Sequence, residues 1–304
     1  MTLSTLEITE LVIGGALSGG TPVLFATTGE ILSQRAGIVN LGLEGAMLIG
    51  AVAATWTYVT TGSLFLAVLV GAMAGGLLGT VHAALVEGAK VEMLASGLCI
   101  FFIGRGLSAF AGYPLVGKRL PGITNLSIPF LSSLPLVGKS LFSQDALVYL
   151  GLNTAVLTYF FLFYSKWGLM VRATGENATT AMALGVPTHR VRLLAVTAGS
   201  ALAGIGGAYI VLGFSHTWLQ GVTGGRGWVS IGLVILARWN PLLAILVAYI
   251  FGGAIIVLQL NAQAAGSTAS PYLLAMLPYL LTIIVLVITQ IWVRRTRFRE
   301  RLTQ

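Results

Sequence analysis

Long apolar runs fill most of the chain, and polar residues fall in short stretches between them. The runs are continuous and reach the length at which an α-helix crosses a bilayer, about 20 residues, whereas the strands of a membrane barrel alternate apolar and polar positions over about ten residues. The pattern therefore predicts helices rather than a barrel. The candidate spans cover residues 6–28, 38–61, 63–87, 93–113, 145–164, 191–212, a short 227–238, 240–261 and 272–293.

The composition excludes a soluble globular domain. Hydrophobic residues make up 56% and charged residues 9% of the 304 residues, and the mean hydropathy is +0.92. Soluble domains carry about 25% charged residues. We therefore expect an all-α integral membrane protein, a polytopic bundle of about eight to nine transmembrane helices, built as a single transmembrane domain over residues 1–304.

Basic residues set the expected orientation, because cytoplasmic connections of membrane proteins carry an excess of lysine and arginine. The arginines between 294 and 301 place the C-terminus in the cytoplasm, and counting back puts the basic stretch 166–192 on the same side and the N-terminus outside. The net charge of +8 follows from this bias and does not indicate nucleic-acid binding. The connection 114–144 contains Lys118 and lies outside against the rule, but its prolines predict an irregular or re-entrant segment.

Small residues recur at helical spacing in two of the predicted spans. Gly71, Gly75 and Gly79 repeat every four residues, and the span 191–212 contains the series Gly199, Ala203 and Gly207. Such faces let helix backbones approach closely in lipid. We expect these faces to form helix contacts.

The stretch from Arg35 to Gly50 is too polar for a plain transmembrane helix and predicts a broken helix of the kind that lines transport paths. On a helix, Asn40 and Glu44 lie four residues apart on one face. An ionised glutamate that faces lipid is costly, so Glu44 must point into the bundle. Two interpretations stay open: Glu44 lines a path, or it pairs with Arg35 or Arg105 and holds helices together.

A second polar stretch, 166–190, predicts a short helix between Gly175 and Gly185, with Thr174 or Asn177 as its cap. This helix is too short and too polar to span, and the expected orientation places it in the cytoplasm. It is either a docking element for another protein or a surface helix without a partner.

Signals for catalysis are absent from the sequence. Gly138-Lys-Ser140 resembles the end of a phosphate-binding loop, but the position of its upstream glycine is Ser133. The three histidines, His82, His189 and His216, are scattered along the chain and indicate no metal site. We therefore expect no catalytic residue, no metal and no cofactor.

Five ordered blocks resemble the permease subunits of ABC importers, in the family of ribose-type sugar, branched-chain amino-acid and nucleoside permeases. The blocks are Gly37-Ile-Val-Asn-Leu-Gly-Leu-Glu-Gly45, Arg172-Ala-Thr-Gly-Glu-Asn177, Ala181-Met-Ala-Leu-Gly-Val186, Ser200-Ala-Leu-Ala-Gly-Ile-Gly-Gly207, and Gly225-Arg-Gly-Trp228 ahead of Trp239-Asn-Pro241. The first block is similar to the form in the nucleoside branch. The resemblance implies a permease subunit for nucleosides that forms half of a translocation pore, with sugar or branched-chain amino-acid transport as the alternative.

The resemblance also implies partners and site residues. ATP hydrolysis would lie on a separate ATPase subunit, a second and different permease chain would complete the pore, and an extracytoplasmic lipoprotein would deliver substrate to the cell inner membrane. The segment around Glu176 to Leu184 would be the coupling helix on the ATPase subunit, with Gly175, Glu176, Asn177, Ala181, Leu184 and Gly185 as its residues. Asn40 and Glu44 would line the path.

A nucleoside also needs an apolar face to stack on. Phe214 and Trp218 are therefore expected near the outer mouth of the path, where the other interpretation is an aromatic belt at the membrane interface. An ion-coupled secondary transporter, which would use Glu44 for coupling and need no ATPase, is the alternative from a different class.

Overall fold

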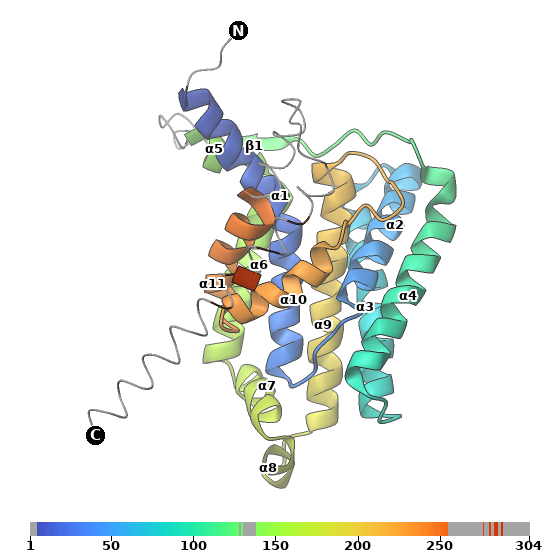
Figure 1. Cartoon of the computed structure of the whole chain (residues 1–304), viewed down its shortest axis with the longest axis vertical. Coiled ribbons are helices and arrows are strands. Elements are labelled where there is room, and N and C mark those ends of the chain that lie inside the picture. The colour runs from blue at the N-terminus through green and yellow to red at the C-terminus, as the bar shows by residue number, and fades with distance from the viewer. Residues whose placement is uncertain are drawn as a thin grey trace, which may run out of the picture.

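The computed structural model describes residues 5–127, 129, 138–254 and the single positions 276, 280, 283, 284 and 287, and these residues are mostly helical (Figure 1). The predicted span 272–293 and the C-terminal arginines therefore lie outside the described residues, apart from those single positions. The long helices are α1 (Thr5–Arg35), α2 (Leu43–Thr61), α3 (Leu64–Glu87), α4 (Met93–Gly112), α6 (Ala146–Tyr164) and α9 (Thr188–Tyr209).

Shorter elements connect or extend these helices. They are the 3₁₀ turn η1 (Tyr113–Leu115), the helices α5 (Gly138–Phe142), α7 (Lys166–Glu176), α8 (Ala178–Ala183), α10 (Arg226–Leu236) and α11 (Pro241–Val247), and the π-helical turns η3 (Ile210–Phe214) and η4 (Ala248–Ala254). Strands β1 (Asn125–Ser127) and β2 (Ser143–Asp145) pair antiparallel, with Leu126 opposite Gln144. The described part of the connection 114–144 therefore holds short elements rather than a plain loop.

Four helical stretches are long and apolar enough to cross a membrane, by length and composition: Leu64–Glu87, Met93–Leu115, Ala146–Tyr164 and Thr188–Phe214. They correspond to predicted spans 63–87, 93–113, 145–164 and 191–212. The predicted span 227–238 is not a crossing, because α10 has 11 residues, which at 1.5 Å per residue reach about 16 Å of the 30 Å hydrocarbon core. Figure 1 shows α10 lying obliquely across the long helices near mid-height.

Helix α9 lies at the centre of the bundle and contacts α1, α2 and α3. Its backbone approaches α3 so closely that a Cβ atom on Gly75 would lie 2.6 Å from the carbonyl oxygen of Ser200. Gly207 meets the backbone of Met47 in α2 at still closer range. The predicted small-residue contacts are therefore confirmed, and they allow the polar groups of these helices to meet in the interior.

The helix breaks between α1 and α2, as the polar stretch from Arg35 to Gly50 predicts, but the break includes Asn40. Residues 36–42, which we call the re-entrant segment, are not helical, and α2 begins only at Leu43. Gly37 has φ +90°, a conformation that favours glycine and turns the chain after α1. Figure 1 shows this segment running from the lower end of α1 upward to the start of α2. Asn40 is therefore not on a helix, and Asn40 and Glu44 do not share a helix face.

The two ends of the bundle differ. In Figure 1 the helices α7 and α8 extend from the lower end, below the last turn of α1, whereas β1 and α5 lie at the upper end. Arg35 donates to the carbonyl oxygen of Trp239 at 3.1 and 3.2 Å. A Cβ atom on Gly175 of α7 would collide with the backbone of Arg35, so Arg35 and the basic stretch 166–192 lie at the same end of the molecule.

Candidate functional site

Glu44 lies in the first turn of α2, is 4% exposed, and accepts three hydrogen bonds from the chain before and within α10. The donors are Thr223 Oγ1 at 2.5 Å, the Gly225 amide at 2.9 Å and the Gly227 amide at 2.7 Å. A carboxylate at this position satisfies amides that a helix N-terminus leaves without internal partners, and it complements the positive end of the helix dipole. Glu44 therefore caps α10 from a different helix.

The expected ion pairs of Glu44 are wrong. Arg35 is directed to the carbonyl oxygen of Trp239, and Arg105 of α4 is exposed and forms no ion pair with Glu44 among the described residues. The described hydrogen-bond donors to this carboxylate are one hydroxyl and two backbone amides. Gly227 is needed for this contact, because a Cβ atom there would lie 2.7 Å from the Cα atom of Glu44.

A cavity of about 500 Å³ opens beside Glu44, between α2, α4 and the N-terminal part of α10. Phe101 and Trp228 form an edge-to-face pair in its wall, with ring centroids 5.3 Å apart and planes at 88°. Arg105 and Gln220 supply polar groups. The remaining lining residues are Leu48, Gly221, Gly224 and Gly225. The wall combines aromatic surface with hydrogen-bonding groups, as small-molecule sites do.

Asn40 lies in the re-entrant segment and is 1% exposed. Its amide donates to Glu30 Oε1 of α1 at 3.0 Å, and its side-chain Nδ2 donates to Ser200 Oγ of α9 at 2.9 Å. Glu30 is itself buried and accepts a 2.8 Å hydrogen bond from Gln34. Asn40 does not line the cavity; it ties the re-entrant segment to α1 and α9. Its place in a substrate path therefore stays a prediction.

The aromatic residues expected at the outer mouth are not among those that line the cavity. Trp218 is 1% exposed and packs over Gly112, where any side chain would collide with the indole ring. The place of Trp218 at the outer mouth or in an aromatic belt therefore stays a prediction. Phe214 is half-buried, and the guanidinium group of Arg226 lies 5.0 Å from its ring centroid. Neither side chain lines the cavity; its aromatic residues are Phe101 and Trp228, and of these only Trp228 lies in a block that the sequence singled out.

The predicted helix between Gly175 and Gly185 is divided. Gly175 and Glu176 end α7, and Asn177 begins α8 by accepting from the Thr180 amide at 3.0 Å. Ala181 is buried, so it faces the protein rather than a partner. The exposed apolar residues of this element are Met182 and Leu184, the latter 80% exposed. The positive φ of Gly185, +84°, turns the chain toward α9.

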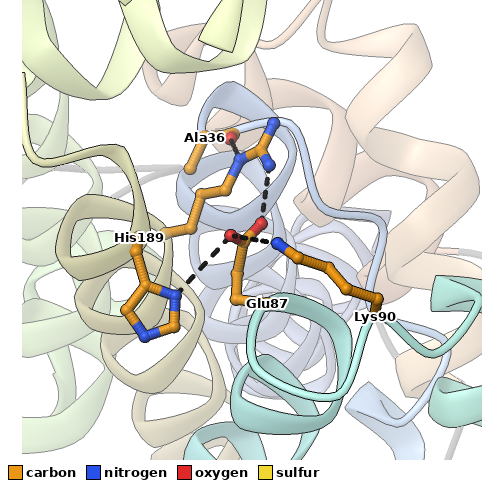
Figure 2. Close-up of polar contacts among 5 residues, drawn as sticks. Ala36, Glu87, Lys90 and His189 are labelled. Carbon is orange, nitrogen blue, oxygen red and sulfur yellow. Dashed lines mark hydrogen bonds and ion pairs between the residues drawn. The ribbon is translucent and has the colours of Figure 1, made fainter. Parts of the chain in front are cut away.

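An ion-pair cluster that the sequence did not reveal lies next to α8 (Figure 2). Glu87, at the end of α3 and 8% exposed, accepts from Arg192 Nη1 at 2.6 Å. Its other oxygen lies 3.9 Å from Lys90 Nζ and 3.7 Å from His189 Nδ1. Arg192 also donates through Nε to the carbonyl oxygen of Ala36 at 3.0 Å. Arg192 therefore joins α9, α3 and the re-entrant segment.

The relatives found by comparison with known proteins are ABC transporter permeases. The chain is 36% identical over 295 residues to a "Putative glucose ABC transporter permease protein" of Haloferax volcanii, covering 90% of each chain. It is 30% identical over 299 residues to a nucleoside ABC transporter permease protein of Lactococcus lactis and 27% identical over 305 residues to a guanosine ABC transporter permease protein of Bacillus subtilis, covering 93% of each chain in both cases. No solved structure is significantly similar to the chain.

The family model described as "Branched-chain amino acid transport system / permease component" matches residues 11–286, which is most of the chain. The match includes the re-entrant segment, the cavity and the α7–α8 element. Together with the apolar helices, it identifies a membrane protein rather than a soluble enzyme. The chain belongs to this family of ABC transporter permeases.

Proposed function

We propose that this permease transports nucleosides and that its substrate passes the cavity beside Glu44. The observation that supports this proposal most is the wall of the cavity, which contains the rings of Phe101 and Trp228 together with the polar groups of Arg105 and Gln220. A nucleoside has a flat base that stacks on aromatic rings and a ribose that needs hydrogen bonds. The nucleoside and guanosine permeases among the relatives support this substrate class.

Sugar transport is the second candidate, because the relative from Haloferax volcanii is named for glucose and is 36% identical. Sugars also pack on aromatic rings, so the cavity alone does not separate the two classes. Branched-chain amino acids, for which the family is named, remain a third candidate.

The proposal includes a complete transporter. A second, different permease chain completes the pore, a separate ATPase subunit hydrolyses ATP, and an extracytoplasmic lipoprotein delivers the substrate. The ATPase subunit docks on α8 through Met182 and Leu184, whose apolar side chains are exposed at the lower end of the bundle. Closure of the ATPase subunits moves α8 and changes the side on which the pore opens.

In the proposed topology, the single domain 1–304 crosses the inner membrane about eight times, since the short span 227–238 is not a crossing. The lower end of Figure 1, with α7 and α8, lies in the cytoplasm together with the C-terminus, and the end with β1 lies outside. The basic stretch 166–192 supports this orientation.

Uptake of labelled guanosine tests the substrate class. In cells that contain the complete transporter, we expect guanosine uptake that unlabelled nucleosides inhibit and that glucose and leucine do not. Phe101→Ala and Trp228→Ala should each lower guanosine uptake about tenfold, since stacking of a base on an aromatic ring contributes about 1–3 kcal/mol. The matched control is Phe110→Ala, which removes an 83% exposed ring of the same helix, α4, that does not line the cavity. Saturable uptake of glucose or leucine, but not of guanosine, would contradict the nucleoside proposal.

Single cysteines test the orientation. In a Cys99→Ser background, Ser127→Cys in β1 and Thr180→Cys in α8 place exposed thiols at opposite ends of the bundle. A membrane-impermeant thiol reagent should label only Ser127→Cys in intact cells and both variants after lysis. Labelling of Thr180→Cys without lysis would reverse the orientation.

A further inference from the structure

Arg192 is the only described residue whose side chain bonds both to the end of α3 and to the re-entrant segment (Figure 2). Its two bonds leave the guanidinium group in different directions: Nη1 donates to Glu87 Oε1 at 2.6 Å, and Nε donates to the carbonyl oxygen of Ala36 at 3.0 Å. Arg192 is 22% and Glu87 8% exposed. The pair is therefore largely shielded from the solvent that weakens surface ion pairs.

Arg192 is also joined firmly to α8. Residues 184–187 form a tight connection in which the Val186 amide donates to the carbonyl oxygen of Ala181 at 3.0 Å and the Thr188 amide donates to that of Val186 at 2.8 Å. Ala181 is buried, which fixes α8 against the bundle. Arg192 lies one helical turn after Thr188, the first residue of α9. A displacement of α8 is therefore passed to the position of Arg192 through a short, hydrogen-bonded connection.

The bond from Arg192 to Ala36 connects Arg192 to the chain that leads to the cavity. Ala36 begins the re-entrant segment, which continues through Asn40 and ends at the start of α2. Glu44, in the first turn of α2, holds the N-terminus of α10. A second contact supports the segment from below, because a Cβ atom on Gly37 would lie 3.3 Å from the Cα atom of Gly175 in α7. The segment is thus held between α7 and Arg192 at its start and by buried hydrogen bonds at its end.

We propose that Arg192 is a positioning residue that transmits movement of α8 to the re-entrant segment, and through Glu44 to the wall of the substrate cavity. The proposal rests on the proposed function, in which α8 is the site of ATPase docking. A guanidinium group suits this role because its donors diverge in a fixed plane, so one side chain holds a carboxylate and a backbone carbonyl at the same time. Lys90 and His189, which are 78% and 57% exposed and lie farther from Glu87, have no such second bond to the residues that the structure describes.

The experiment measures substrate uptake and ATP hydrolysis together, in vesicles that contain the complete transporter. Arg192→Lys keeps a positive charge beside Glu87, but a lysine has a single terminal nitrogen and does not bind Glu87 and the carbonyl oxygen of Ala36 in the same geometry. We expect Arg192→Lys and Glu87→Gln to lower uptake per ATP hydrolysed about tenfold, because residues that connect two sites change the coupling between them by such amounts. Assembly with the ATPase subunit should stay at the wild-type level, and Lys90→Ala is the control that should change neither quantity.

Two results would overturn the proposal. One is wild-type uptake per ATP hydrolysed in Arg192→Lys, and the other is an equal fall of ATP hydrolysis, assembly and uptake, which would make the pair merely structural. If Glu87→Gln fails to assemble, Arg192→Lys decides alone. Failure of the docking proposal gives a different result, because the ATPase subunit would then still associate with the Leu184→Arg variant. If only the role of Arg192 is wrong, Leu184→Arg still disrupts association, but Arg192→Lys has wild-type uptake per ATP hydrolysed.

Discussion

Leu184→Arg is expected to abolish transport while the protein remains inserted in the membrane. Leu184 is 80% exposed and stands beside Met182 at the free end of the α8 element, so no described core contact depends on it. An arginine in an apolar protein interface must lose its water without gaining a partner, which costs several kcal/mol. Co-purification with the ATPase subunit and substrate uptake should therefore both fall to background.

Leu184→Met is the matched control, because methionine is also apolar and of similar volume, so this variant should retain both assembly and uptake. Glu176→Lys tests the edge of the same surface, since Glu176 is exposed at the end of α7. Ala181→Arg is a poor test of docking, because Ala181 is buried and the substitution would displace α8 itself. Normal uptake by Leu184→Arg at wild-type protein levels would show that α8 is not the docking element.

Much of the helical framework follows from hydropathy. The spans at 63–87, 93–113, 145–164 and 191–212 were predictable within a few residues, because a helix of the length that crosses lipid must be apolar nearly throughout. The small-residue contact between α3 and α9 was predictable for a related reason: glycines four residues apart have little use in a helix other than close packing.

The local structure around Asn40 was not predictable from periodicity. Residues 38–61 read as one span because Ile38 and Val39 are apolar, although Gly37 and Gly42 allow the chain to leave the helical conformation. The break is stabilised from outside the segment, through the bond between the Asn40 amide and Glu30 of α1. A sequence read one span at a time does not contain that contact.

Long-range partners were equally inaccessible. Glu44 was expected to need a cation, but its charge is compensated by amides that lie about 180 positions later, at the start of a helix too short to span. No sequence pattern marks Glu87, because acidic residues contribute little to membrane orientation. Its bond to Arg192 depends on how α3 and α9 pack against each other. The sequence predicts that their glycine faces meet, but not which residues at the helix ends then lie opposite one another.

The geometry of Glu44 also bears on ion-coupled transport. All three of its described partners are donors, from Thr223 and from the amides of Gly225 and Gly227. A coupling cation would need oxygen ligands around it, as unwound helices supply in secondary transporters. The N-terminus of α10 presents positive dipole ends instead, which favours a structural carboxylate over a cation site.

Glu44→Gln is expected to destabilise the protein and to reduce transport, although it preserves the shape of the side chain. A glutamine has one acceptor oxygen, and its amide group would face at least one of the donors that the carboxylate now binds. A buried amide left without an acceptor costs about 1–3 kcal/mol, which should lower the thermal unfolding temperature of the purified protein and loosen the cavity wall around α10.

The comparison that decides the role of Glu44 uses two further variants. Thr223→Val removes one donor and leaves the carboxylate with both amides, so its effect on unfolding should be smaller than that of Glu44→Gln. Arg35→Gln should not rescue Glu44→Gln, because Arg35 bonds to Trp239 and not to Glu44. Rescue by Arg35→Gln, measured as recovery of the unfolding temperature, would restore the ion-pair interpretation. Wild-type stability and uptake in Glu44→Gln would instead show that the contact between Glu44 and α10 has no role in transport.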